Sequence, residues 1–222
     1  MFILFGCEES QAVCIEFRKR GHQAFSCDLE PCSGGHPEWH FQMDVFEVIK
    51  GGKLKTQAGT EVFIPSWNMG VFFPPCTDLA MSGAKHFEKK RKDGRQQKSI
   101  DFFMAFTKTN IPKWAIENPI GIMSTIYRKP DQIINPYDFD DAAQKPTCLW
   151  LKGLPKLQAT NLGDAPLFGH SLNKGEFHVT KSGKKLPKSF TPNLLLTEEK
   201  LRSPICATIG RMKLPNRMKD NG

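Results

Sequence analysis

The stretch GVFFPPCTDLAMS, residues Gly70–Ser82, carries the strongest structural signal in the chain. It begins with Val71–Phe73, a short apolar run of the kind that predicts a buried parallel strand. Pro74 and Pro75 then end the strand, because proline has no N–H to donate to a ladder. We therefore expect Cys76 at the carboxyl end of a strand, the edge at which open α/β sheets bind ligands.

A second stretch has the same design. Trp114–Pro119, which reads WAIENP, begins with an apolar run and ends at a proline. It places Glu117 and Asn118 at the end of another predicted strand, so that one strand end offers a thiol and the other an acid with an amide. The alternative is that Cys76 is a half-buried structural thiol and Glu117 an ordinary loop acid.

The first 28 residues predict the opening unit of a nucleotide-binding α/β fold. We expect a strand at Met1–Gly6, a helix at Glu8–Arg20 that Gly21 ends, and a strand at His22–Cys27 that closes on Asp28. In such units a cofactor meets the helix amino terminus, and an acid after the second strand takes ribose hydroxyls. The first turn lacks G-x-G-x-x-G, which disfavours a dinucleotide.

Pro75-Cys76 and Glu117-Asn118 together resemble the two catalytic motifs of DNA cytosine-5 methyltransferases, in the order of that family. The resemblance implies a Rossmann-like α/β fold that uses S-adenosylmethionine (SAM), with a mostly parallel sheet and a small basic appendage. It also implies that Cys76 attacks carbon 6 of cytosine, that Glu117 protonates ring nitrogen 3, and that Asn118 orients neighbouring backbone or the base edge. The short format is most similar to bacteriophage members.

The same resemblance implies where the cofactor binds. The first turn is similar to a reduced form of the family's first motif, Asp28 to its ribose acid, and Asp44 to the acid that meets the adenine amino group. As an alternative, Asp28 or Asp44 is a turn or cap residue. The implied SAM-binding residues are Phe5, Gly6, Glu8, Asp28, Asp44 and Pro74.

The formal net charge of +8 is concentrated in two segments, Lys85–Lys98 and Leu151–Phe190, each with seven basic residues against two acids. Such clusters fit a polyanion, single- or double-stranded DNA, although two solvated lysine-rich loops are the alternative. In the family, the segment after the catalytic cysteine is a mobile loop that closes over the target base. The residues expected to bind nucleic acid are Lys85, Lys89, Lys90, Arg91, Lys92, Arg95 and Lys145.

The composition divides the chain into three parts. We expect residues 1–150 to form the SAM-binding catalytic domain and residues 151–192 to form a short basic segment in place of a target-recognition domain. About forty residues are too few for a second core. Residues 193–222 are expected to pack back on the catalytic domain.

Seven cysteines in an uneven scatter argue against a disulfide framework and favour a reducing, cytoplasmic setting. No apolar run reaches the length of a membrane span, and the start lacks the pattern of a signal peptide. The spacing of Cys27, Cys32, His36 and His40 could suggest zinc, but Cys27 falls in a predicted strand and no second knuckle follows, so no metal is expected.

The sequence therefore predicts an enzyme that transfers a methyl group from SAM to carbon 5 of cytosine in DNA through a covalent Cys76 adduct. A monomer is expected, with a partner chain for target recognition left open. Two alternatives remain. The substrate is RNA or a pyrimidine nucleotide, or the protein is a catalytically weak nucleic-acid binder, since its first turn has few glycines and the region of Gln144 lacks the family's arginine.

Overall fold

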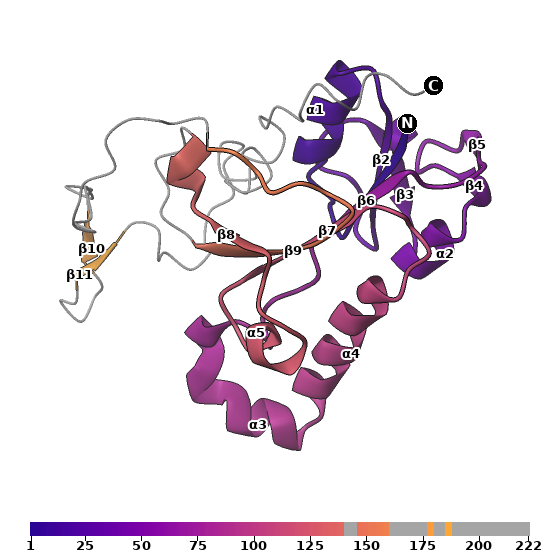
Figure 1. Cartoon of the computed structure of the whole chain (residues 1–222). Coiled ribbons are helices and arrows are strands. Elements are labelled where there is room, and N and C mark those ends of the chain that lie inside the picture. The colour runs from indigo at the N-terminus through magenta and orange to yellow at the C-terminus, as the bar shows by residue number, and fades with distance from the viewer. Residues whose placement is uncertain (140–145, 160–176, 180–184, 188–222) are drawn as a thin grey trace.

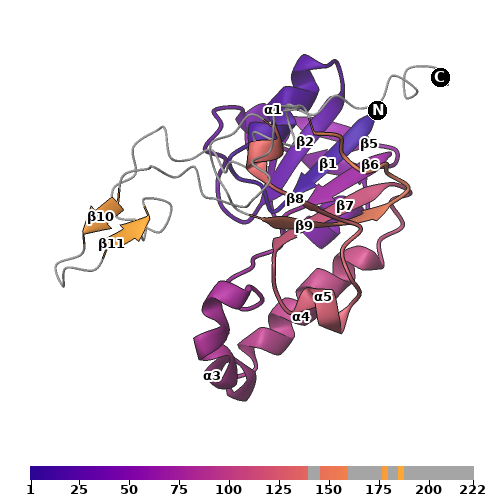
Figure 2. The same ribbon diagram turned by 60° about the vertical axis from the view of Figure 1, so that its left-hand side comes forward.

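The computed structural model describes residues 1–139, 146–159, 177–179 and 185–187. Its centre is a seven-stranded sheet in the order β3-β2-β1-β6-β7-β9-β8 (Figures 1 and 2). Neighbouring strands from β3 to β7 are parallel, whereas β9 runs antiparallel to both β7 and β8. The expected α/β class with a mostly parallel sheet is thus confirmed. The strands span Phe2–Gly6 (β1), Gln23–Asp28 (β2), His40–Gln42 (β3), Met69–Phe72 (β6), Trp114–Pro119 (β7), Gln132–Ile134 (β8) and Thr147–Lys152 (β9).

Helices and hairpins fill the connections between these strands. The α-helices are Ala12–Lys19 (α1), Val45–Ile49 (α2), Phe87–Lys92 (α3), Arg95–Thr107 (α4) and Met123–Ile126 (α5). The 3₁₀ helices are Pro37–Trp39 (η1), Met81–His86 (η2) and Pro136–Phe139 (η3). Two separate antiparallel hairpins pair Gly52–Lys55 (β4) with Glu61–Ile64 (β5), and Phe177–Val179 (β10) with Lys185–Pro187 (β11).

The two faces of the sheet carry separate hydrophobic cores, because successive residues of a strand point to opposite faces. Leu4 of β1 packs with side chains of α2 and α4, among them Phe106. Ile3 and Phe5 pack on the other face against α1, where Phe17 lies. Burial on both faces explains why β1 is a continuous apolar run, as predicted.

Helix α1 is shorter than the sequence suggested, because it begins at Ala12 instead of Glu8. Residues 7–11 form a turn in which Cys7 and Gln11 adopt left-handed backbone angles, with φ of 60° and 57°. Gly21, with φ of 82°, follows the helix as expected of a glycine in a left-handed C-terminal turn.

The basic segment after Cys76 is helical, which corrects the expectation of a loop. It forms η2, α3 and the start of α4, with Gly94 at φ of 77° between the two α-helices. Helix α4 accordingly begins at Arg95, ahead of the run from Ser99 that its aromatic residues predicted. Figures 1 and 2 show α3 beyond the sheet, joined back to it by α4.

Strand β9 crosses the domain boundary proposed at residue 150, since it continues to Lys152. The chain beyond it stays tied to the sheet, because Leu157 and the Gln132 side chain exchange two hydrogen bonds of 2.8 Å. Lys145 and residues 193–222 lie outside the described residues. Within the described part of the chain, no helix is both long and apolar enough to span a membrane.

Candidate active site at the carboxyl edge of the sheet

The carboxyl ends of three parallel strands meet at one place on the sheet edge. Gly6 of β1 lies opposite Phe72 of β6, and Phe72 lies opposite Ile116 of β7. The Phe73 N–H extends this pairing by donating to the Gly6 carbonyl at 3.0 Å. The segments that follow, with Cys76 after β6 and Glu117 in the last part of β7, therefore share one edge of the sheet.

A buried hydrogen bond joins the two sequence motifs directly. The Asn118 side-chain amide donates to the Pro74 main-chain oxygen at 2.8 Å. Asn118 is 1% exposed and Pro74 is buried as well. This contact fits one of the two roles expected for Asn118, the orientation of neighbouring backbone. Pro74 contributes its carbonyl to this bond, and its buried position leaves little surface for a cofactor.

Cys76 is half-buried and lies at the start of a tight turn. Its carbonyl accepts the N–H groups of Leu79 and Ala80, both at 2.9 Å. The turn then pairs with the segment after β7, because Ala80 forms a bridge with Gly121. A Cβ atom on Gly121 would lie 2.3 Å from the Leu79 carbonyl oxygen, so only glycine permits this approach.

Two exposed apolar side chains border this pairing, a feature that the sequence reasoning missed. The Met81 N–H donates to the Ile120 carbonyl at 3.0 Å, and the two side chains are 53% and 46% exposed. Met81 follows the cysteine turn and Ile120 follows the Glu117-Asn118 pair. Large apolar residues exposed side by side often mark a contact with a ligand or partner.

Glu117 lies in strand β7 and is 8% exposed. The antiparallel strand β9 places Leu149 opposite Glu117 and Cys148 opposite Asn118. Burial raises the pKa of the Cys148 thiol, and the charge of Glu117 raises it further. A buried thiol with a raised pKa is a poor nucleophile, so Cys76 stays the candidate.

Glu8 lies in the turn between β1 and α1 and is 2% exposed. Its Oε1 accepts the Val13 N–H at 2.7 Å, near the first turn of α1. Its Oε2 has no hydrogen-bond partner among the described residues. Burial raises the pKa of this carboxyl to about 8, against hydrogen bonds from the main chain that lower it. A buried carboxyl is thus present where the sequence predicted a cofactor.

Asp28 and Asp44 converge on the same turn from the ends of β2 and β3. The pKa of the Cys7 thiol is raised, mainly by burial and further by the negative charges of both aspartates. Asp44 caps α2 by accepting the Phe46 N–H at 2.8 Å, and Asp28 accepts the Glu30 N–H at 3.1 Å. Both therefore fill the local cap or turn roles considered as the alternative, and each bond uses one oxygen of a carboxylate that accepts through two.

Two other predicted cofactor residues are enclosed by packing. The Phe5 ring is fully buried, 5.1 Å from the Phe17 ring, so only its main chain reaches the turn. A Cβ on Gly6 would meet Val45 at 2.7 Å. The sequence reasoning overlooked Leu29, which directly follows Asp28 and is 72% exposed. The sequence feature that could have drawn attention to Leu29 is a large apolar residue directly after the acid at the end of a strand.

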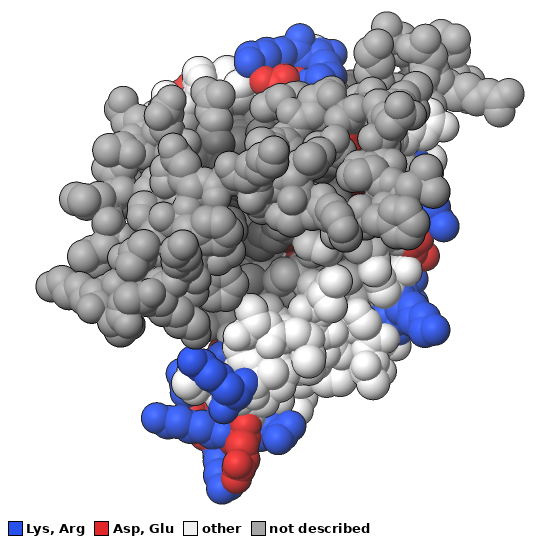
Figure 3. Space-filling view, turned by 90° about the vertical axis from the view of Figure 1, so that its left-hand side faces the viewer, with Lys and Arg blue, Asp and Glu red and all other residues white. Residues whose placement is uncertain are grey.

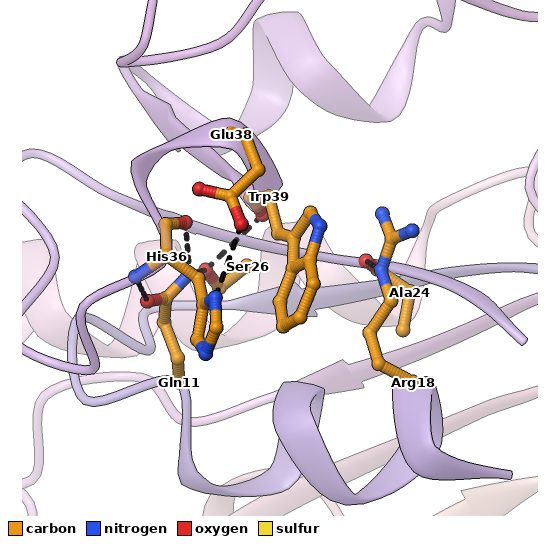
Figure 4. A network of polar contacts seen from close by, with 7 residues as sticks. All are labelled: Gln11, Arg18, Ala24, Ser26, His36, Glu38 and Trp39. Atoms are coloured by element: carbon orange, nitrogen blue, oxygen red, sulfur yellow. Dashed lines mark hydrogen bonds and ion pairs between the residues drawn. The ribbon is translucent and has the colours of Figure 1, made fainter.

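A network of hydrogen bonds centred on Gln11 holds the first turn in place (Figure 4). The Gln11 amide donates to Ser26 Oγ at 3.2 Å and to the His36 carbonyl at 2.8 Å, and the His36 N–H donates back to Gln11 at 3.0 Å. The His36 ring stacks on Trp39 at 3.9 Å. This network ties the loop after β2 to the turn after β1.

The residues weighed for zinc have other partners. Cys27 contacts the Met43 carbonyl through its sulfur at 3.3 Å, and burial raises its pKa to about 12. The two His40 ring nitrogens pair with Ser26 Oγ at 2.9 Å and with the Glu30 carbonyl at 3.0 Å. Within the described ranges, no three His, Cys, Asp or Glu side chains form a metal-binding group.

The predicted nucleic-acid residues on the helical segment divide into two kinds. Lys90 is only 7% exposed and pairs with Asp78, so a phosphate-binding role does not fit it. Figure 3 shows Lys and Arg side chains gathered, with acids among them, at the end of the molecule where α3 lies. The exposed members of the predicted set in this segment are Lys85, Lys89, Arg91, Lys92 and Arg95.

Comparisons with known proteins give no family for this chain. No protein-family model matches it, and no curated protein matches it at a significant level.

Proposed function

We propose that this protein transfers a methyl group from SAM to carbon 5 of cytosine in DNA through a covalent Cys76 adduct. The observation that carries the proposal is the buried hydrogen bond from Asn118 to the Pro74 carbonyl. It joins the cysteine turn to the strand of Glu117 at adjacent parallel strand ends. A thiol and a buried carboxyl on neighbouring strand ends suit covalent attack on a pyrimidine that also needs a proton.

The strand order is compatible with a Rossmann-like fold, since the strands from β3 to β7 are parallel and β9 runs antiparallel between β7 and β8. Ligands of such sheets bind outside the carboxyl ends of the strands. The proposed site lies at that edge.

The residues of the first turn fit SAM better than a phosphate-bearing cofactor. Phosphates bind at helix amino termini, but Glu8 already brings a carboxyl to the Val13 N–H of α1. SAM has no phosphate and carries an α-ammonium group, which can pair with the buried Glu8 carboxyl once that carboxyl gives up its proton. Asp28 and Asp44 can accept from the ribose hydroxyls and the adenine amino group, and the exposed Leu29 offers an apolar surface to the adenine ring.

The chain's own residues account for the activation of the base. The Cys76 thiolate forms a bond to carbon 6 while Glu117 gives a proton to ring nitrogen 3, so that carbon 5 becomes nucleophilic. SAM supplies an electrophilic methyl group when bound. After carbon 5 is methylated, a base takes its proton, nitrogen 3 returns its proton to Glu117, and the bond from sulfur to carbon 6 breaks. Glu117 is 8% exposed, so its carboxyl is largely shielded from water.

DNA is the favoured substrate because the segment after Cys76 presents basic side chains. Lys85, Lys89 and Arg91 are exposed on η2 and α3, directly after the cysteine turn. Such residues bind phosphates flanking a base that is extruded or single-stranded. A free nucleotide offers few phosphates to such a surface.

The deciding experiment traps the adduct. DNA that contains 5-fluorocytosine should form a stable complex with the protein in the presence of SAM, because fluorine at carbon 5 cannot leave as a proton does. Cys76→Ser should abolish the complex, whereas Cys32→Ser, which changes another half-buried thiol, should retain it. Parallel methyl-transfer reactions on DNA, RNA and nucleotide identify the substrate class. An adduct that survives in Cys76→Ser would contradict the proposal.

A further inference from the structure

Helix α3 contains one lysine that differs from all its basic neighbours. Phe87–Lys92 reads FEKKRK, and its exposed residues include Lys89, Arg91 and Lys92. Lys90 is only 7% exposed and shares the buried face with Phe87, three residues earlier. Lysine is almost never buried without a partner, so its contacts should explain its position.

Lys90 holds the two residues that follow Cys76. Its ammonium group donates to the Thr77 main-chain oxygen and lies 3.1 Å from Asp78 Oδ1. The side chains of Lys90 and Asp78 are 9% and 17% exposed, so water screens the pair weakly.

Helix α4 contacts the same short segment. The Gln96 amide donates to the Asp78 carbonyl at 3.1 Å, and Ser99 Oγ donates to Asp78 Oδ2 at 3.3 Å. Asp78 thus receives bonds from α3 and from α4. These contacts lie immediately after Cys76, whose own carbonyl closes the turn with the Leu79 and Ala80 N–H groups.

A buried ion pair contributes little net stability compared with apolar side chains of the same volume. An apolar residue at position 90 would share the buried face of α3 with Phe87. The lysine does what an apolar residue cannot, because it fixes a carbonyl and a carboxylate at defined points. The buried lysine therefore serves to orient the segment that follows Cys76.

We propose that Lys90 is a positioning residue that clamps the Cys76 turn to α3. The outer face of the same helix carries the exposed lysines, which on the proposed function bind the DNA backbone. One short helix then connects the phosphate contacts to the turn that presents the nucleophile. Lys89 and Lys90 are adjacent in sequence, but Lys89 faces the DNA backbone and Lys90 faces the turn after Cys76.

Amide hydrogen exchange measured by NMR tests the clamp without any substrate. Lys90→Met should speed exchange of the Leu79 and Ala80 amides about tenfold, because the turn opens locally more often. Exchange of the Leu4 amide in β1 should stay unchanged, which separates local opening from a loss of global stability. Lys89→Met is the matched control and should leave all these amides at wild-type rates.

Kinetics on DNA test the positioning role. Lys90→Met should lower kcat about tenfold with little change in KM for DNA, since a displaced nucleophile slows chemistry and not binding. Lys89→Met should raise KM instead. Asp78→Asn is the second variant in case Lys90→Met folds poorly: it nearly preserves shape, keeps an oxygen for Ser99 and weakens the ion pair, so it should move both readouts in the same direction as Lys90→Met.

Each outcome decides a stated point. Wild-type exchange at Leu79 and Ala80 in both Lys90→Met and Asp78→Asn would overturn the clamp. Faster exchange with unchanged kcat would overturn the positioning role. A wild-type protein that forms no adduct and methylates no DNA would overturn the proposed function and with it the catalytic part of this inference, while the exchange result would still decide the clamp.

Discussion

The turn after β1 and the turn after β6 lie side by side on the sheet edge but are held in different ways. The first, residues 7–11, is bent locally, with left-handed backbone at Cys7 and Gln11 and a buried Glu8 carboxyl at the start of α1. The second, residues 76–80, which the structure describes in full, contains no positive φ. It is held by side chains of α3 and α4, among them Lys90 and Gln96, and Asn118 of β7, 44 residues from Pro74, fixes the Pro74 carbonyl just before the turn.

This difference separates two kinds of preorganisation. A turn bent by its own residues keeps its shape as long as those residues remain. It also fixes the position of the amino terminus of the helix that follows. A turn held from outside depends on every element that reaches it. The nucleophile sits on the second kind, so substitutions in β7, α3 and the segment after β7 should affect chemistry, whereas substitutions in the first turn should affect cofactor binding and stability.

The largest expected effect is on the acid beside the second turn. Glu117→Gln should slow methyl transfer by at least about 100-fold, because an amide cannot give the ring a proton as a carboxylic acid does. Binding of S-adenosylhomocysteine, followed by calorimetry, should change little. Glu47→Gln changes an exposed acid on α2 and serves as the control. Ordinary rates in Glu117→Gln would assign the proton transfer to another group.

The buried Glu8 carboxyl of the first turn should instead make the free energy of unfolding depend on pH. The folded-state pKa of Glu8 is raised to about 8, so the folded protein holds a proton that the unfolded chain loses above its ordinary value near 4.5. The free energy of unfolding should therefore fall as pH rises between about 4.5 and 8, by up to about 1.4 kcal/mol per pH unit, and level off above that range.

Glu8→Gln keeps a side-chain oxygen for the Val13 N–H and removes the titration, so urea unfolding at several pH values should lose this slope. Glu9→Gln changes the neighbouring, half-exposed acid and should keep the slope. Parallel curves for wild type and Glu8→Gln would show that Glu8 does not hold the proton.

The outside support of the second turn can be broken with one methyl group. Gly121→Ala would place a Cβ 2.3 Å from the Leu79 carbonyl oxygen, which must move away from the segment after β7. We expect a loss of about 1–3 kcal/mol in the free energy of unfolding, the usual cost of overpacking. Ser82→Ala is the control, because it changes an exposed side chain in the same segment. Equal denaturation midpoints for the two variants would contradict the expected crowding.

The sequence predicted what local patterns determine. Apolar runs placed β1, β2, β6 and β7, and the proline-cysteine and glutamate-asparagine pairs indicated which strand ends to examine. The expected loop after Cys76 was wrong, although Phe87 and Lys90 carry the i, i+3 spacing of a helix face. That signal was hidden because lysines are normally exposed, and only the tertiary structure shows that Asp78 draws one of them inward.

Contacts between distant segments were beyond the sequence for a physical reason. The pairing of β9 with β7, which brings Cys148 opposite Asn118, depends on the register of an antiparallel strand that begins almost thirty residues later. The bond between Asn118 and Pro74 depends on the same placement of strands. A single sequence specifies such registers only through the packing of the complete sheet.

Salt dependence sharpens the comparison of the two turns, since only the second leads into a basic helix. Replacing the exposed Lys89 by Gln should flatten the slope of log affinity against log salt on duplex DNA by roughly 0.9 if it neutralises one phosphate. The buried Lys90, replaced by Met, should leave that slope as it is, because its charge is already paired with Asp78. Fluorescence anisotropy with one labelled duplex at several salt concentrations measures both. Equal slopes for wild type and Lys89→Gln would mean that this side of α3 is merely solvated, whereas a flatter slope for Lys90→Met would mean that the clamp opens when DNA binds.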